Sequence, residues 1–340
     1  HERGTWLATY FFFQFSSSSV GPVIAGSIGS RYGWRSFFWL GTGMSAFATV
    51  LLVFFYPETK FHRDGNTAKV EEQGDVSTLP DQYLRKGRLS KHQYALFARP
   101  EKNWLRFLLH DLIAPVLVFF NPIVFWAALM LACAADLQLL FNITQSGLFS
   151  APPYNWSPET VGFSNFAIFT GALVGFLTAG PLSDRWAQRM TVRNGGVREA
   201  EMRLPALIPY CAFFIVAHIV GAVGYARLWP WQAIVVCGFG FSGLAITSIP
   251  SIAIAYAIDS YRPVSGEIMV VGTVLKNVLG FCLSYWVFDL HERKGWTAVF
   301  MVQFAVGMLP VVLSVPLYFY GKEIRRWKRD SKLHRMERMI

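Results

Sequence analysis

Eight apolar runs, each about as long as a membrane-spanning helix, divide this chain. Such a helix needs about 20 consecutive, mostly apolar residues. The runs cover residues 5–28, 34–56, 114–140 (149 at the latest), 161–182, 204–225, 231–258, 264–288 and 296–320. A bilayer offers backbone polar groups no water, so segments of this length satisfy them internally as helices. The sequence therefore predicts an all-α, polytopic membrane protein with eight transmembrane helices.

Composition excludes a soluble domain of ordinary kind. Hydrophobic residues make up 53% of the chain and charged residues only 15%, against roughly a quarter charged in soluble domains. The net charge of +10 would suit nucleic acid in a soluble protein, but beside this apolar content it indicates a membrane protein with basic faces. We expect no nucleic-acid partner. The four cysteines all lie within the runs and are too few for a disulfide scaffold.

The distribution of basic residues orients the runs. Most of the 31 Lys and Arg residues fall on one face, in the segments 57–110, 185–203 and 321–340. The opposite face carries only Arg31, Arg35, Arg227, Arg293 and Lys294. Cytosolic loops carry the excess of positive charge, so both termini are predicted to be cytosolic. We expect a multi-pass protein of the plasma membrane, with the vacuolar membrane as the alternative.

The runs also show a trace of internal repetition. The second opens on Gly33-Trp34 and the eighth on Gly295-Trp296, and each closes on an aromatic pair before a lysine. Related ends of two halves are typical of duplicated transporters. The halves are unequal, however, because two runs precede the polar segment 57–110 and six follow it. Four runs are expected to be missing from the N-terminal side.

Three short segments carry recognisable patterns. In the first, Gly21, Pro22 and Gly26 would let two helices approach closely and would kink the span. In the second, Gly180 is followed by Asp184 and Arg185, with Arg189 four residues on. This segment is expected to form a cytosolic loop, where an Asp and an Arg at a helix end can pair with helix dipoles and partner charges. The third segment contains Asp259, Arg262 and Glu267, then Lys276 and Asn277.

These segments resemble the major facilitator superfamily, and within it fungal transporters of the drug:proton antiporter type. The resemblance covers the whole chain, as the fifth to twelfth helices of a twelve-helix protein. It implies that the chain lacks the first four helices and that His1 marks a truncation. The implied organisation is residues 1–56 as the end of the N-terminal lobe, 57–110 as a cytosolic linker with a short interfacial helix, 111–320 as the C-terminal lobe and 321–340 as a basic tail.

The resemblance also gives the three segments roles. Gly21, Pro22 and Gly26 match the antiporter motif of the fifth helix, although Ala25 replaces one of its glycines, and would seal the lobe interface and bias transport toward export. The segment 180–189 matches the signature loop that locks one conformation. Asp259, Arg262 and Glu267 would form an inner gate. The alternatives are ordinary small-residue packing, a plain topogenic loop and a static surface network.

Two ionisable residues within the runs are candidates for function, because a charge in the hydrocarbon is costly. Lys276 lies near the middle of the seventh run and Asp136 in the outer half of the third. In the family, both helices border the central cavity, so a proton or a cationic substrate could release a pair between them. A fixed structural pair, or snorkelling of Lys276 toward water, is the alternative.

Polar and aromatic residues near these charges complete the predicted pathway. After Asp136, the residues Gln138, Asn142 and Gln145 make a loosely polar stripe on one helix face. Cavity lining and interhelical hydrogen bonding both explain such a stripe. Tyr256 and Tyr285 could line the cavity and favour organic cations. With Lys276 and Asn277, these are the candidate substrate and proton residues.

The sequence contains no enzyme signature. It lacks zinc-ligand spacing, a phosphate-binding loop and a nucleophile elbow, so we expect no enzyme, cofactor or metal. The predicted function is alternating-access transport of a small organic molecule, as proton-coupled export of drug-like or cationic compounds. Proton-coupled uptake of polyamines or another nutrient is the alternative within this class. A transport-incompetent membrane sensor or assembly protein is the alternative in another class.

Overall fold

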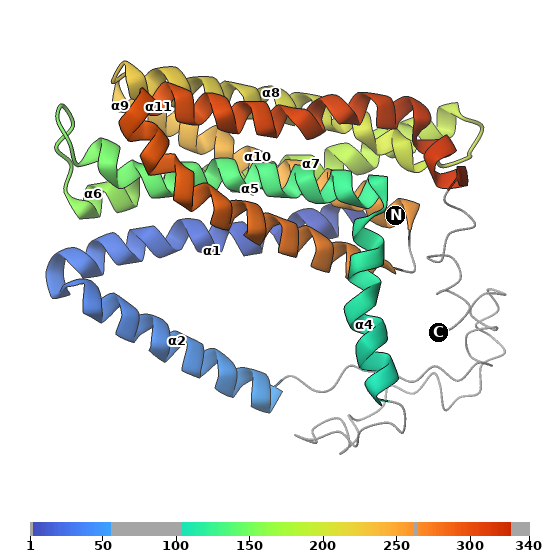
Figure 1. Cartoon of the computed structure of the whole chain (residues 1–340), viewed down its shortest axis with the longest axis horizontal. Coiled ribbons are helices and arrows are strands. Elements are labelled where there is room, and N and C mark those ends of the chain that lie inside the picture. The colour runs from blue at the N-terminus through green and yellow to red at the C-terminus, as the bar shows by residue number, and fades with distance from the viewer. Residues whose placement is uncertain (1–2, 56–103, 262–263, 328–340) are drawn as a thin grey trace. The chain divides into compact units, whose positions relative to one another are not determined.

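The computed structural model describes residues 3–55, 104–261 and 264–327, and within these ranges all regular elements are helices (Figure 1). Backbone contacts divide the chain into two units, residues 1–34 with 108–340, and residues 35–107. Nearly all of the predicted linker, Arg262 and most of the basic tail lie outside the described residues. A helix, α4 (Trp104–Phe119), begins where the short interfacial helix is predicted.

Long helices build the first unit. Its elements, in chain order, are α1 (Arg3–Tyr32), the end of α4, α5 (Pro122–Phe149), α6 (Pro158–Phe163), α7 (Phe166–Arg193), η3 (Ala200–Leu207), α8 (Ile208–Ile219), η4 (Val220–Gly224), α9 (Trp231–Ala233), η5 (Ile234–Gly240), α10 (Phe241–Ser260) and α11 (Ser265–Trp327). The second unit contains most of α2 (Trp34–Phe55), none of whose residues is buried.

Six helical segments in the described ranges are long and apolar enough to cross a membrane, where the sequence predicts eight. The first predicted span is helical as α1 but is not among the six, and its polar run Ser16–Ser19 lowers its apolar character. The last two predicted spans are continuous in α11, broken only at Gly295, where φ is 80° and ψ is 174°. At Gly295 the chain turns back, so that the second half of α11 runs in roughly the opposite direction to the first (Figure 1).

Positive φ angles coincide with two of the predicted joints. Gly33 separates α1 from α2 with φ of 81°, and Gly295 has φ of 80°. Glycine lacks the Cβ atom that makes such angles costly for other residues. The two Gly-Trp pairs that suggested a repeat therefore mark equivalent local breaks.

Two helix boundaries differ from the sequence prediction. The third span begins at Pro122 instead of residue 114, because Asn121 caps α5 by accepting a hydrogen bond from the Ile123 amide (3.1 Å) and Pro122 suits the first helical position. The segment 180–189, predicted as a loop, is helical, since α7 continues through Pro181 to Arg193. The chain leaves the helix only at Asn194, before two glycines with positive φ.

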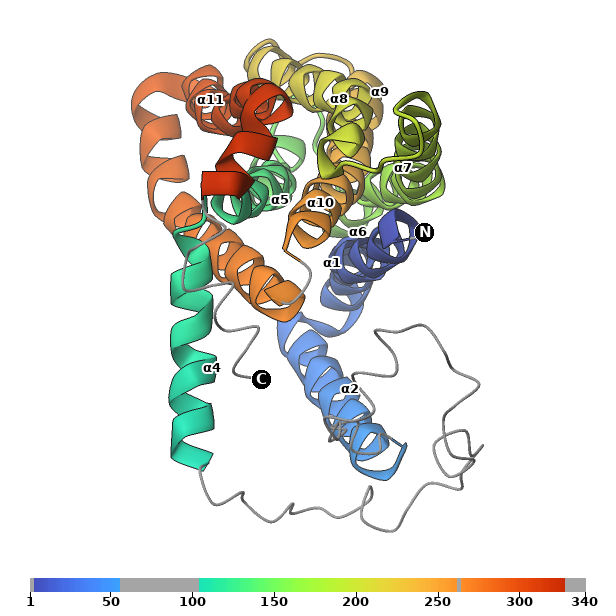
Figure 2. The same cartoon turned by 90° about the vertical axis from the view of Figure 1, so that its right-hand side faces the viewer.

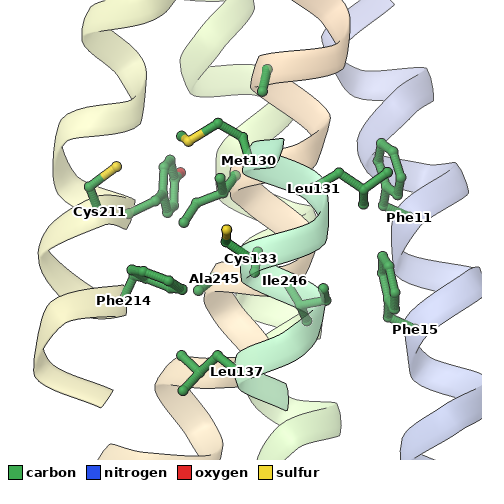
Figure 3. Close-up of a cluster of buried hydrophobic side chains, with 14 of the residues drawn as sticks. Phe11, Phe15, Met130, Leu131, Cys133, Leu137, Cys211, Phe214, Ala245 and Ile246 are labelled. Carbon is green, nitrogen blue, oxygen red and sulfur yellow. The ribbon is translucent and has the colours of Figure 1, made fainter. Parts of the chain in front are cut away.

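The core of the first unit surrounds α5 and α10. Figure 3 shows Phe11 and Phe15 of α1 on one side of α5, and Cys211 and Phe214 of α8 on the other. Along α10, the residues from Ser242 to Ala257 are all buried. The view in Figure 2 shows α1, α7, α8 and α5 grouped around α10, and α10 contacts each of them.

Small residues set the closest helix approaches. A Cβ atom on Gly171 of α7 would lie 1.9 Å from the Gly240 carbonyl oxygen, and one on Gly243 of α10 would lie 2.1 Å from that of Ile168. On α1, a Cβ on Gly26 would lie 2.6 Å from the Pro158 oxygen at the start of α6. A Cβ on Gly21 would meet nothing within 4 Å. Only one of the two motif glycines therefore makes a backbone-close contact.

We expect Gly26→Ala to destabilise the first unit by about 1–3 kcal/mol, because the added methyl group overpacks the α1–α6 contact. Thermal unfolding of the detergent-solubilised protein measures the change. Gly21→Ala is the matched control on the same helix, with open space around its Cβ. Equal melting temperatures for the two variants would contradict the assignment of this contact.

Candidate functional site

A cavity of about 380 Å³ lies between α1, α5 and the first half of α11. It contains Asp136 from α5 and Lys276 from α11, the two ionisable residues predicted from the sequence. The remaining lining residues are Gln14, Phe15, Ser18, Ala135, Gln138, Leu139, Asn142, Asn277, Gly280 and Phe281. The three helices thus bring together five of the eight predicted pathway residues.

The two charged groups share the cavity without a close ion pair. Asp136 is 4% exposed, and its Oδ1 atom has no hydrogen-bond partner in the described part of the chain. Lys276 Nζ lies 5.5 Å from the ring centroid of Phe15, within the range of a cation–π interaction. The ion pairs of the described residues include none between Asp136 and Lys276 within 4.0 Å. The Oδ1 atom of Asp136 therefore remains buried without a partner among these residues.

The α1 wall of the cavity is joined to α5 by hydrogen bonds. Gln138 Nε2 donates to Ser18 Oγ (3.2 Å) and Ser19 Oγ (3.4 Å). The run of serines that lowers the apolar character of α1 therefore has a packing role against the polar stripe of α5. Asn142, one turn further along that stripe, has a buried Oδ1 atom without a partner in the described structure.

Three predicted pathway residues lie away from the cavity. Gln145 is buried, and its Oε1 atom accepts hydrogen bonds from Asn165 Nδ2 (2.9 Å) and Ser164 Oγ (3.3 Å), which joins α5 to the α6–α7 turn. Tyr256 is fully buried against Trp126, with ring centroids 5.7 Å apart. Tyr285 is 71% exposed.

A second polar site forms where α7, η3 and α10 meet, and its centre is Arg203. This guanidinium is 1% exposed and binds two carboxylates, Asp184 of α7 through Nη1 and Asp259 of α10 through Nε, each at 2.7 Å. Its Nη1 also donates to Ser183 Oγ (3.0 Å). We call Arg203, Asp184 and Asp259 the Arg203 cluster. The cluster crosslinks three helical elements at one end of the unit.

The N-terminal end of α1 joins this cluster. The amide and the hydroxyl of Thr5 both donate to Asp184 Oδ2, at 3.2 and 3.1 Å. The carboxylate of Asp184, in the segment 180–189, therefore binds both the buried Arg203 and the N-terminal end of α1.

Two further ion pairs connect η3 with the end of α11. Glu201 accepts from Arg325 Nη2 at 2.6 and 2.7 Å, and Glu199 pairs with Lys322. Burial raises the pKa of Tyr261, which lies in the turn after α10 near Glu201 and Arg325. Its hydroxyl is therefore neutral at physiological pH and adds no charge here.

The other residues of the predicted conformational motifs have different surroundings. Gly180 is buried in α7, whereas Arg185 and Arg189 are exposed and line a surface recess with Arg193. Glu267 lies in the first turn of α11, where the helix dipole favours an acidic side chain. Asp184 thus pairs with Arg203, not with the arginines that follow it in sequence.

Sequence reasoning gave no role to several of these residues. The available sequence signal for Arg203 was its place among acidic and basic residues at the edge of a predicted span. Gln14, Phe15 and Ser18 lie within a predicted span, and nothing local marks the face that meets α5. In the described ranges, no group of three or more His, Cys, Asp or Glu side chains could hold a metal ion.

Comparison with known families agrees with the motifs and the helical architecture. The sequence model of the family described as Major Facilitator Superfamily matches residues 1–275. The chain belongs to the major facilitator superfamily. This membership agrees with the expectation of a multi-pass membrane protein that is not an enzyme.

Individual relatives within the superfamily are fungal. An uncharacterized MFS-type transporter of Schizosaccharomyces pombe is 24% identical over 377 residues, covering 96% of this chain and 64% of the relative. Protein HOL1 of Saccharomyces cerevisiae is 32% identical over 215 residues, covering 62% and 36%. A probable efflux pump, mfs2, of Aspergillus flavus is 23% identical, covering 97% and 75%.

The chain spans less than two thirds of the length of the S. pombe transporter and of HOL1. No solved structure matches it.

We expect Arg203→Met to destabilise the protein by about 3–5 kcal/mol, because it removes the buried guanidinium that bridges Asp184 and Asp259. Thermal unfolding in detergent measures the loss. Arg189→Met is the matched control, since Arg189 is exposed and has no ion pair with another described residue. A melting temperature for Arg203→Met within a degree of that control would show that the cluster is not structural.

Proposed function

We propose that this protein is a secondary transporter that moves small organic molecules across a fungal membrane by alternating access, as a proton-coupled exporter of cationic compounds. The observation that carries the proposal is the cavity between α1, α5 and α11, in which Asp136 and Lys276 lie on different helices. Buried ionisable residues in a membrane protein mark ion and substrate pathways. Membership of a superfamily of transporters supports the same function.

The coupling would use the carboxylate oxygen of Asp136 that has no hydrogen-bond partner among the described residues. A buried carboxylate without a hydrogen-bond donor is unfavourable, and either a proton or an organic cation relieves that cost. Because both compete for one carboxylate, binding of the cation on one side would release the proton there. Asn142, Asn277 and Gln14 line the same cavity and can orient polar groups of the cargo.

The Arg203 cluster would serve as the lock of one conformation. In the superfamily architecture, α1 belongs to the N-terminal lobe and α7 to the C-terminal lobe, so the bonds from Thr5 to Asp184 would bridge the lobes. Alternating access requires such bridges to break and reform. Gly26, seated against α6, would provide the seal on the other part of the same interface.

We further propose that the chain contains the fifth to twelfth helices of the superfamily fold. The reversal at Gly295 supports counting α11 as two spans, and α1 is long enough, at 30 residues, to count as another. The domain organisation with a C-terminal lobe over 111–320 follows from that assignment. Export is favoured over uptake by the relative that is named a probable efflux pump.

We predict that Asp136→Asn abolishes cation-driven proton release while leaving the fold intact, because an amide cannot exchange a proton. The measurement uses proteoliposomes that contain a pH-sensitive dye and receive a lipophilic cation. Asp289→Asn is the matched control, since Asp289 is exposed and paired with Arg293 of the same helix at 2.9 Å. Proton release by Asp136→Asn equal to that of the control would exclude Asp136 from coupling.

We predict that Arg193 lies on the cytosolic side and Arg227 on the outer side. Both residues are exposed. In a Cys282→Ser background, which removes the exposed native thiol, an impermeant maleimide should label Arg227→Cys in sealed cells, and Arg193→Cys only after permeabilisation. The reverse pattern would overturn the predicted orientation.

A further inference from the structure

Lys276 occupies the position in the cavity where the charged head of a cationic ligand would bind. We infer that its ammonium group is a tethered occupant of a cation subsite formed by Phe15, Asp136 and Gly280, and that a ligand must be positively charged to displace it. The inference rests on the proposed function in one respect, that this cavity receives the cargo. It adds the feature that selects the cargo by charge.

The aromatic wall of the subsite is the ring of Phe15. This ring is 6% exposed and stacks on Phe11, with centroids 6.0 Å apart and planes inclined by 12°. Packing therefore holds its face toward the cavity, where Lys276 Nζ lies 5.5 Å from the centroid. A cation–π contact is strongest when desolvated, so any ammonium group in the cavity is attracted to this face.

The anionic wall is the free oxygen of Asp136. Gly280 lies directly beside this atom, since a Cβ atom at that position would lie 3.5 Å from Oδ1 and 3.1 Å from Leu139 Cδ2. A larger residue would fill the space beside the carboxylate. The subsite thus has an aromatic face and an unpaired carboxylate oxygen, on residues that line a cavity of about 380 Å³.

The placement of Lys276 differs from that of a fixed ion-pair partner. Its ammonium lies over Phe15 and not within 4.0 Å of Asp136, on a flexible four-carbon stem. A ligand cation that reaches Phe15 must move this ammonium aside. Because the tether keeps the competitor at a high effective concentration, it weakens the apparent affinity of every ligand that takes this position, and only a cation regains the attraction to Phe15 and Asp136.

The test measures equilibrium binding to the full chain in lipid nanodiscs. The probe is benzyltrimethylammonium, whose charge does not depend on pH, and the comparison ligand is neopentylbenzene, its uncharged isostere. We expect Lys276→Met to bind benzyltrimethylammonium about tenfold more tightly than the native chain does, which corresponds to about 1.4 kcal/mol. Neopentylbenzene, which gains no attraction from Asp136, should bind more weakly than benzyltrimethylammonium to Lys276→Met.

Matched variants identify the cause. Lys276→Arg keeps a tethered cation and should bind the probe as weakly as the native chain. Lys294→Met makes the same exchange outside this cavity, next to Gly295 in α11, and should leave the affinity for the probe unchanged. Asp136→Asn added to Lys276→Met should remove the gain. Melting temperatures confirm that each variant is folded.

Different failures have different meanings. Equal probe affinity in Lys276→Met and the native chain would overturn the tethered-occupant inference while leaving a cation-binding cavity, and with it the proposed function. Weaker binding by Lys276→Met would also overturn it, because Lys276 would then help to hold the ligand. Binding of neopentylbenzene but not of the cation by every variant would overturn both the subsite and the proposal of cationic cargo.

Discussion

The close approach of helix backbones to one another is the constraint on which the rest of this structure depends. In a bilayer, apolar side chains gain little by leaving lipid for one another, so helices associate through close packing and hydrogen bonds. Gly171 and Gly243 let α7 and α10 meet almost backbone to backbone, and Gly26 does the same for α1 and α6. These contacts fix the positions of α1 and α10, and those helices in turn position the walls of both polar sites.

Polar groups inside such a packing either find partners or remain available for chemistry. Gln138 and Gln145 lie on the same stripe of α5, and both are hydrogen-bonded to neighbouring helices. Arg203 is paired with two carboxylates. Asp136 keeps a buried, unpaired oxygen beside a cavity. An unsatisfied buried group has a free-energy cost, and the location of this one is the reason to connect that cost with function.

The sequence predicted the features that follow from length and local chemistry. Apolar run lengths gave the helices, and the Gly-Trp pairs gave the breaks at Gly33 and Gly295. Periodicity placed Gln138 and Gln145 on one face, but could not tell that Gln145 would meet Asn165 across the α6–α7 turn. The helical extension of α7 to Arg193 was missed because the charged residues of this segment, and its resemblance to a signature loop, indicated a loop. The role of Arg203 depends on three elements distant in sequence, which no local pattern encodes.

α1 is the element that connects the two sites. Thr5 at one end of it binds Asp184 of the Arg203 cluster, Phe15 in its middle faces Lys276, and Gly26 near its other end is seated on α6. A rigid movement of α1 against α5 and α7 would therefore break the bonds to Asp184 and withdraw the ring from Lys276 together. Packed helices of this kind shift between discrete arrangements and do not deform continuously. Such a movement would link the occupancy of the cavity to the state of the Arg203 cluster through one helix, with no need for a longer pathway of side chains.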